Sequence, residues 1–195
     1  LLSVATYWIE NFDIDAWRLD VANEIDHQFW KDFRKAVLAK KPDLYILGEI
    51  WHTSQPWLQG DEFHAVMNYP LSESIKDYFL RQRKKTEQFI SEINSQSMYY
   101  KQQISEVMFN LLDSHDTERI LTTAKGNVQH VKAALTFLYL QKGTPCIYYG
   151  TELALIGGPD PDCRRVMPWD RVSEDNDMLN FMKKLIKVRK EVASI

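Results

Sequence analysis

The stretch D-A-W-R-L-D-V-A-N-E at 15–24 begins with a short apolar strand pattern that ends at an aspartate, Asp20. Two more acidic residues hold similar positions: Glu49 ends L-Y-I-L-G-E, and Asp116 lies just past the apolar part of F-N-L-L-D-S-H-D. In a protein that alternates strands with helices the strands run parallel, so their carboxyl ends point the same way. We therefore expect three carboxylates on one face of one sheet. Because like charges cost free energy when they approach, their gathering predicts a functional site.

The rest of the chain continues this alternation of strands and helices. Strands are predicted at 15–21, 44–50, 65–68, 107–113 and 146–149. Helices are predicted where apolar residues recur at three- and four-residue spacing, at 1–12, 27–40, 71–82, 86–98, 126–140 and 175–192. A long loop rich in Gly, Pro and Asp spans 150–172, and loops of that length tend to be functional.

Two architectures fit this pattern, a doubly wound open sheet and a (β/α)8 barrel. The open sheet usually carries a glycine-rich phosphate loop after its first strand, but here that position holds D-V-A-N-E, without glycine. Charged side chains at the ends of several strands match the barrel. The sequence therefore predicts an α/β protein with part of a (β/α)8 barrel, since five strands cannot close a barrel of eight.

Composition limits the remaining possibilities. A chain of 195 residues would normally form one domain, and its net charge of −3 gives no reason to expect nucleic-acid binding. No apolar stretch is long enough for a bilayer span, and no signal peptide is visible. The helix at 1–12 begins abruptly, so we expect the chain to start partway through something larger. Cys146 and Cys163 are expected to be free thiols, and no Cys/His spacing indicates zinc.

Several motifs carry a resemblance to a known family. W-R-L-D-V-A-N-E at 17–24, G-E-I-W-H at 48–52 and L-L-D-S-H-D-T-E-R at 111–119 resemble the second, third and fourth signatures of the α-amylase superfamily of retaining glycoside hydrolases. Further motifs are similar to its neopullulanase, cyclomaltodextrinase and maltogenic amylase branch: V-A-N-E, M-N-Y-P at 67–70, C-I-Y-Y-G at 146–150 and D-P-D-C-R-R-V-M-P-W-D at 160–170. The resemblance runs essentially end to end.

The resemblance implies that Asp20 is the nucleophile, Glu49 the general acid/base and Asp116 a third carboxylate that binds sugar hydroxyls. A retaining glycosidase needs two carboxyl groups about 5–5.5 Å apart, one ionised to attack and one protonated to donate. Arg18 lies two residues before Asp20 on the same strand face, so its charge is expected to favour ionised Asp20. The apolar neighbours of Glu49 are expected to favour its protonated form.

Other candidates have two interpretations each. His115 is either a donor in the same subsite as Asp116 or a turn histidine, and Trp51 is expected to stack on a sugar. Glu24 either contacts substrate or caps the helix at 27–40. The remaining aromatic and basic candidates either contact sugar or have structural roles: Trp57, Tyr149, Trp169, Arg164 and Arg165.

The sequence also departs from the family pattern. The first signature, D-x-x-x-N-H, is absent, and so are the first three barrel strands and the loop domain that follows the third. Residues 1–195 therefore correspond to about strands four to eight of the catalytic barrel. The lysine–histidine pair of calcium-dependent relatives is replaced by Asn23-Glu24, so no metal and no cofactor are expected. Thr151 and His64 stand where relatives often have Asp.

The implied function is retaining hydrolysis of α-1,4-glucosidic bonds, with α-1,6 bonds and transglycosylation as further activities. Maltodextrins, cyclomaltodextrins or pullulan are the expected α-glucan substrates, and the expected compartment is the cytoplasm. Two alternatives stay open: an amylase-fold transferase that acts on sucrose or trehalose, and a non-catalytic amylase-like binding module. An incomplete barrel exposes sheet edges, so the isolated chain is expected to associate, for example as a homo-oligomer. It is also expected to be inactive, because one wall of the sugar subsite is missing.

Overall fold

The computed structural model describes residues 1–192, and its centre is a set of short parallel strands. These are β1 (Ala16–Leu19), β2 (Tyr45–Gly48), β3 (Ala65–Val66), β4 (Phe109–Asn110) and β5 (Thr144–Pro145). β1, β2 and β3 form one parallel sheet, β4 and β5 form another, and a parallel bridge between Met67 and Phe109 joins the two. The strands therefore neighbour one another in chain order, as in a barrel wall.

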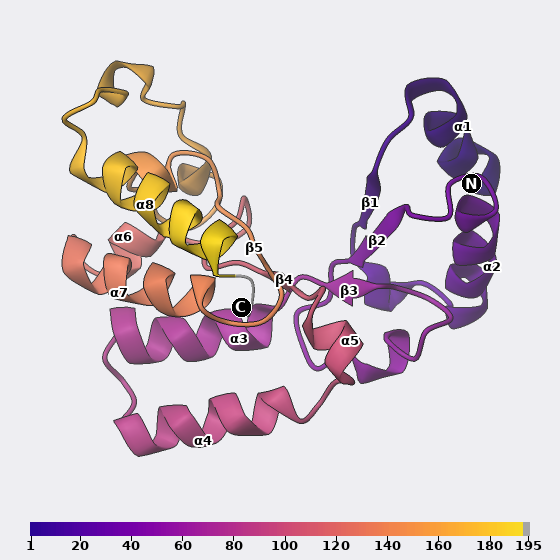
Figure 1. Ribbon diagram of the computed structural model, residues 1–195, viewed down its shortest axis with the longest axis horizontal. Coiled ribbons are helices and arrows are strands. Elements are labelled where there is room, and N and C mark those ends of the chain that lie inside the picture. Colours follow the sequence, from indigo (N-terminus) through magenta and orange to yellow (C-terminus); the bar gives the residue numbers. More distant parts are fainter. Residues whose placement is uncertain (193–195) are drawn as a thin grey trace.

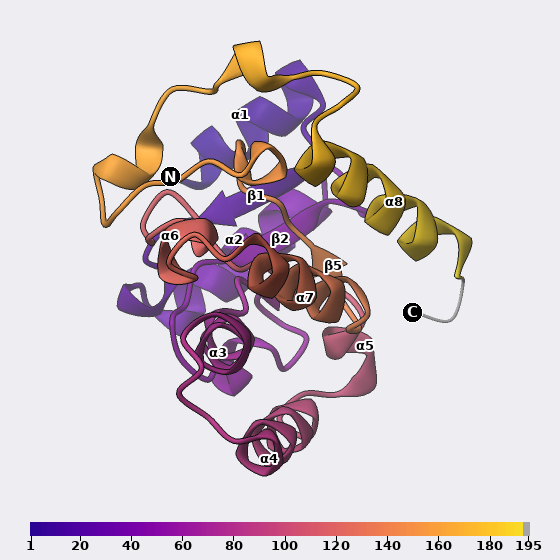
Figure 2. The same ribbon diagram turned by 90° about the vertical axis from the view of Figure 1, so that its left-hand side faces the viewer.

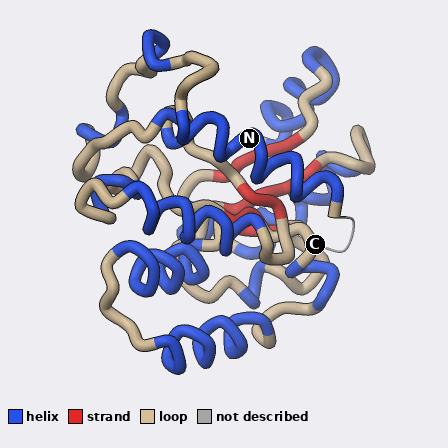
Figure 3. The backbone as a smooth tube through the Cα atoms, turned by 60° about the vertical axis from the view of Figure 1, so that its left-hand side comes forward, coloured by secondary structure: helices blue, strands red, loops and turns tan. Residues whose placement is uncertain are grey.

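Helices surround these strands (Figures 1 and 3). They are α1 (Leu2–Phe12), α2 (His27–Leu38), α3 (Tyr69–Ile75), α4 (Thr86–Ser97), α5 (Gln102–Ser105), α6 (Ile120–Thr123), α7 (Val128–Tyr139) and α8 (Asp177–Glu191). α1 and α2 cover the outer side of β1 and β2 (Figure 1). In both Figures 1 and 2, α4 lies on the side of α3 that faces away from α7. No helix within 1–192 combines the length and apolarity needed to cross a membrane.

The predicted strand at 146–149 is wrong. β5 lies two residues earlier, because the Thr144 amide donates to the Met108 carbonyl at 2.8 Å and the Cys146 amide donates to Asn110 at 2.7 Å. Beyond Cys146 the chain leaves this ladder. The Tyr149 carbonyl accepts instead from the side chain of Arg119, which lies after β4.

The other differences are in length. The other strands fall inside their predicted ranges but are shorter. The predicted helix at 71–82 is α3 followed by a π-helical turn, η3 (Lys76–Leu80). The one-turn helices α5 and α6 were not predicted, because four residues are too few to show a helical period.

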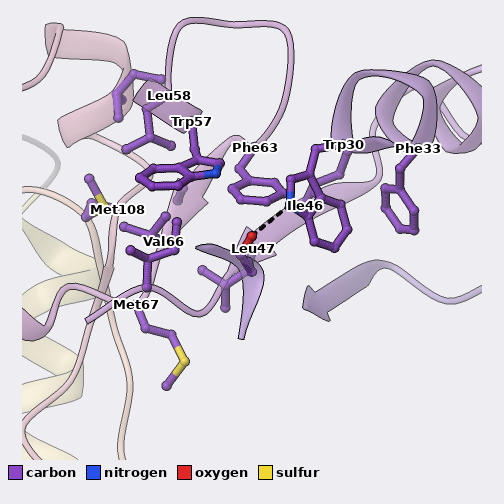
Figure 4. Close-up of a cluster of buried hydrophobic side chains, with 14 of the residues drawn as sticks. Trp30, Phe33, Ile46, Leu47, Trp57, Leu58, Phe63, Val66, Met67 and Met108 are labelled. Carbon is purple, nitrogen blue, oxygen red and sulfur yellow. Dashed lines mark hydrogen bonds between the residues drawn. The ribbon is translucent and has the colours of Figure 1, made fainter. Parts of the chain in front are cut away.

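Two apolar clusters hold the helices against the strands. The first joins β2 and β3 to α2 and contains Trp30, Phe33, Ile46 and Phe63 (Figure 4). The second joins α3, α7 and α8 through side chains that include Leu135, Leu138, Met178, Met182 and Leu185. The helices predicted at 126–140 and 175–192 therefore each bury one apolar face, although Val188 of α8 is exposed.

Trp57 also belongs to the first cluster (Figure 4), and its ring stacks on that of His27. Of its two interpretations, the structural one is confirmed. Both cysteines are free thiols, as predicted.

Candidate active site

Adjacent parallel strands set the positions of Asp20 and Glu49. In the register of β1 and β2, Arg18 pairs with Leu47 and Leu19 pairs with Gly48, so the next residue of each strand is the acidic one. The Glu49 amide continues the ladder by donating to the Leu19 carbonyl at 2.9 Å. Both carboxylates therefore leave the sheet side by side at its carboxyl edge.

The backbone turns sharply directly after Asp20. Val21 has φ 45 and ψ 43, a left-handed conformation that is costly for a β-branched residue. This conformation allows the Val21 amide to donate to Oε2 of Glu49 at 2.9 Å. The turn therefore fixes the Glu49 carboxylate from the strand that carries Asp20, a contact that no local pattern predicts.

One guanidinium joins the two carboxylates. Nη1 of Arg18 pairs with Oδ1 of Asp20, and Nη2 lies 3.0 Å from Oε1 of Glu49. The second contact is an ion pair without hydrogen-bond alignment, because Nη2 has no hydrogen-bond partner among the described residues. The expected pairing of Arg18 with Asp20 is confirmed, and the same guanidinium also lies beside Glu49.

Burial separates the two carboxyl groups. The side chain of Glu49 is 6% exposed, whereas that of Asp20 is 72% exposed. The surroundings of Glu49 are not apolar as expected, because Trp51 Nε1 also donates to its Oε1 at 3.2 Å. Glu49 is thus a buried carboxyl group held by two hydrogen-bond donors and one ion pair, beside an aspartate open to solvent.

Aromatic stacking connects Glu49 with the third carboxylate. The ring of Trp51 lies flat on the ring of Tyr69, with centroids 3.8 Å apart and planes 5° apart. The Tyr69 hydroxyl is 3.4 Å from Oγ of Ser114, which accepts from the Asp116 amide at 3.2 Å. Burial raises the pKa of the Tyr69 phenol to about 12, and the negative charges of Glu49 and Asp116 act in the same direction. Neither Tyr69 nor Ser114 was a sequence candidate.

Asp116 lies in the loop between β4 and α6. Nε2 of His115 is 3.0 Å from its Oδ2, and Nη2 of Arg164 is 3.4 Å from its Oδ1. Nε of Arg164 also donates to the His115 carbonyl at 2.9 Å. Arg165 instead forms an ion pair with Asp162 of its own loop, so of the two arginines only Arg164 reaches a candidate carboxylate.

Glu24 contacts none of these residues. It is exposed, and within residues 1–192 its Oε1 accepts from the Asn23 side chain alone, at 3.3 Å. Asp26, not Glu24, caps α2, since its Oδ1 accepts from the Gln28 amide at 2.9 Å. The capping interpretation of Glu24 is therefore wrong.

The three carboxylates lie apart from the cavity between α3, α4 and α5, and no metal site forms around them in the described part of the chain. Across residues 1–192, no group of three or more His, Cys, Asp or Glu side chains could hold a metal ion. The cavity has a volume of about 640 Å³, with Asn68, Ile93 and Tyr100 in its lining. The candidate carboxylates instead lie at an open edge of the sheet.

Acidic side chains at the carboxyl ends of neighbouring parallel strands, with helices outside, are typical of (β/α)8-barrel enzymes. This chain is a segment of such a barrel. The chain belongs to the alpha-amylase catalytic-domain family, whose model matches residues 1–193.

Similar proteins agree with this assignment. The chain is 54% identical, over 98% of its length, to an intracellular maltogenic amylase of Bacillus subtilis, and covers 32% of that protein. It is 50% identical, over its full length, to a cyclomaltodextrinase of Geobacillus thermopakistaniensis, of which it covers 33%. A solved cyclomaltodextrinase superposes with a TM-score of 0.95 at 50% identity, over 98% of this chain and 33% of the other. The chain thus spans about a third of the length of the curated relatives it matches.

Proposed function

We propose that residues 1–195 are about strands four to eight of the catalytic barrel of a longer retaining glycoside hydrolase. The segment lacks the first three strands and the loop domain after the third. The complete enzyme hydrolyses α-1,4-glucosidic bonds, and also α-1,6 bonds, in maltodextrins, cyclomaltodextrins or pullulan, with some transglycosylation. Relatives named maltogenic amylase, cyclomaltodextrinase and neopullulanase support this substrate class. We place the enzyme in the cytoplasm, in line with the name of the Bacillus subtilis relative.

One observation carries the proposal: a single guanidinium contacts two carboxylates of opposite exposure at the ends of adjacent strands. In the proposed reaction the exposed, ionised Asp20 attacks the anomeric carbon, and Glu49 protonates the oxygen that leaves. This gives a covalent glycosyl-enzyme ester and a free sugar end. Glu49 then takes a proton from water, which attacks the same carbon and releases Asp20 with net retention.

The other site residues support these two groups. Asp116 and His115 bind hydroxyls beside the reacting carbon, where contacts strengthen as the ring flattens towards the oxocarbenium-like state. The face of Trp51 turned away from Tyr69 offers a surface for a sugar ring, and the indole remains 48% exposed. Glu24 has no contact that ties it to this site, and its exposure leaves it available to substrate beyond the cleavage point.

The test is the substitution Asp20→Asn in the complete protein that carries this segment. Loss of the nucleophile should lower kcat on cyclomaltodextrin by about 10³-fold or more, with the fold intact. NMR of the first product should show the α-anomer in the wild type. Unchanged turnover in Asp20→Asn, or a first product of inverted configuration, would end the proposal.

The same assay separates the two alternatives. An amylase-fold transferase would form products from sucrose or trehalose in preference to cyclomaltodextrin or pullulan. A non-catalytic binding module would retain oligosaccharide binding and release no product from any of these sugars.

A further inference from the structure

Arg119 is a fully buried arginine that forms no direct ion pair with a carboxylate in the described part of the chain. It lies between Asp116 and α6, and its exposed fraction is 0%. Burial raises the pKa of the nearby Asp113 carboxyl group, and the charge of Arg119 acts in the opposite direction. Arginine is rarely buried without a partner, because removing its charge from water is costly. This residue therefore needs an explanation other than packing.

The guanidinium binds backbone oxygens and aromatic rings from two other segments. Nε donates to the Cys163 carbonyl at 2.8 Å, and Nη1 donates to the Tyr149 carbonyl. The carbon at its centre lies 4.0 Å from the ring centroid of Tyr148 and 4.6 Å from that of Tyr149. The Arg119 backbone amide adds a hydrogen bond to the Gly157 carbonyl at 3.0 Å. One side chain thus joins the segment after β4, the segment after β5 and the loop at 157–165.

The same loop reaches the candidate site on its other side. Cys163, whose carbonyl binds Arg119, donates its thiol to the His115 carbonyl at 3.1 Å. The next residue, Arg164, contacts both that carbonyl and the Asp116 carboxylate. Only one peptide unit therefore separates the Arg119 contact from the contacts to His115 and Asp116.

The packing between Arg119 and this loop leaves no room for a side chain at Gly157. A Cβ atom added there would lie 2.6 Å from the Asp162 carbonyl oxygen and 3.2 Å from Cγ of Arg119. A substitution at Gly157 would therefore crowd both the loop and Arg119.

Selection for folding stability alone would not favour a buried guanidinium at position 119. Nη2 of Arg119 is buried without a hydrogen-bond partner among the described residues. Apolar side chains often replace buried charges without loss of stability, and an unsatisfied donor adds to the cost here. The arginine guanidinium is planar and its donors point in fixed directions, so it can hold two carbonyl groups at a defined distance. Neither an apolar side chain nor lysine can do this.

We propose that Arg119 is a positioning residue, which holds the loop at 157–165 against the segment at 113–119 and so fixes the carboxylate of Asp116. The proposal rests on the proposed function, in which Asp116 binds the sugar hydroxyls. Arg119 touches no substrate and acts through the peptide unit between Cys163 and Arg164.

The experiment compares four variants of the complete protein: Arg119→Lys, Arg119→Met, Gly157→Ala and the matched control Arg165→Lys. Arg119→Lys keeps the charge and loses the planar guanidinium, and Gly157→Ala displaces the loop without changing residue 119.

Each of the three test variants should lower kcat on cyclomaltodextrin by about 100-fold, as expected when the reacting groups are displaced by about 1 Å. KM should change less than kcat, because Asp116 acts most strongly in the transition state. Arg165→Lys should stay within about twofold of wild type, because the Arg165 side chain, among the described residues, pairs with Asp162 of its own loop.

Hydrogen exchange provides a readout that does not depend on Asp116. Amide exchange at 157–165 should accelerate in the test variants and not in Arg165→Lys, while exchange in β1 and α2 stays at the wild-type rate. Unchanged exchange at 157–165, or kcat within twofold of wild type in folded Arg119→Lys, would overturn the inference.

Asp116→Asn separates this inference from the proposed function. If Asp116→Asn retains full turnover, the role of Asp116 in the proposed function fails, and the Arg119 proposal fails with it as an account of catalysis. If Asp116→Asn is inactive but Arg119→Lys is fully active, only the positioning role of Arg119 fails.

Discussion

Nη2 of Arg18 lies 3.0 Å from Oε1 of Glu49, although the two residues are on different strands and Arg18 also pairs with Asp20. A guanidinium has five N–H donors in one plane, so it can hold two carboxylates at once. The pair of acidic groups is therefore arranged around a cation before any sugar is bound. This relationship makes Arg18 the residue whose removal should affect both groups together.

Arg18→Gln in the complete protein should lower kcat by roughly 10- to 100-fold, because hydrogen bonds to charged groups contribute about 1.5–3 kcal/mol. Steady-state kinetics on cyclomaltodextrin would measure this. Arg81→Gln is the matched control, since Arg81 pairs with Glu73 and Asp77 away from the site and should leave kcat unchanged. Equal kcat values for the two variants would contradict the bridging role.

Trp51 should reveal two separable contributions. Trp51→Phe keeps a ring to stack on Tyr69 and loses the Nε1 donor to Glu49, so kcat should fall about two- to tenfold, the size of one hydrogen bond. Trp51→Ala also removes the sugar-facing surface, so KM should rise in this variant and stay near wild type in Trp51→Phe. Similar KM values in both variants would exclude a sugar contact for Trp51.

His64 should make stability depend on pH. Its Nδ1 accepts from the Ile46 amide at 3.0 Å, and burial lowers the pKa of its imidazole from 6.5 to about 4. The folded protein thus binds fewer protons than the unfolded chain between these values. Stability is present above pH 6.5 and is lost as the pH falls towards 4, by at most about 3 kcal/mol.

Urea unfolding of the complete protein at pH 7 and pH 4.5 would measure this loss. His64→Asn can keep an acceptor for the Ile46 amide and has no proton to gain, so the pH-dependent loss should be smaller by the share that His64 contributes. The same pH dependence in both proteins would show that His64 is not the titrating group.

Gly48 directly precedes Glu49, and a Cβ atom there would lie 2.7 Å from ring carbons of buried Phe63. Gly48→Ala should therefore destabilise the protein by about 1–3 kcal/mol and displace Glu49, with a loss of kcat. Gly158→Ala is the control, since its Cβ would meet only Oδ2 of Asp162, at an ordinary 3.4 Å. Melting temperatures of the two variants and of wild type would decide, and equal values would contradict the crowding at Gly48.

The isolated 195-residue chain should associate and should hydrolyse maltodextrin negligibly. β1 and β5 each pair with one strand only among the described residues, so two sheet edges are available for contact between copies. Sedimentation velocity over a range of concentrations tests association, and a sharp monomer at every concentration would count against it. Full activity of the isolated chain would show that the segment needs no further barrel strands.

Much of the fold could be predicted because it depends on local pattern. Apolar runs that end at Asp20 and Glu49 predicted β1 and β2 and their parallel course, which the register of the two strands confirms. The position of β5 was predicted wrongly because C-I-Y-Y is as apolar as a strand. In the structure β5 pairs with β4 only as far as Cys146, and the Tyr149 carbonyl accepts a hydrogen bond from Arg119 instead.

The site was predictable in its residue types and not in its contacts. Arg18 was expected beside Asp20 because both lie on one strand, but its ion pair with Glu49 crosses to a second strand. Tyr69 and Ser114 could not be predicted as site residues because their importance comes from the neighbours they contact in the folded protein.

The amino-acid sequence by itself determined which residues end the strands and which chemical groups those ends carry, because strand periodicity and the alternation with helices are properties of neighbouring residues. Only the tertiary structure decided that Asp20 is open and Glu49 enclosed, that Val21 turns its amide onto Glu49, and that Arg119 is buried among three segments. Burial and hydrogen-bond partners arise from segments far apart in the chain, and no local pattern encodes how those segments meet.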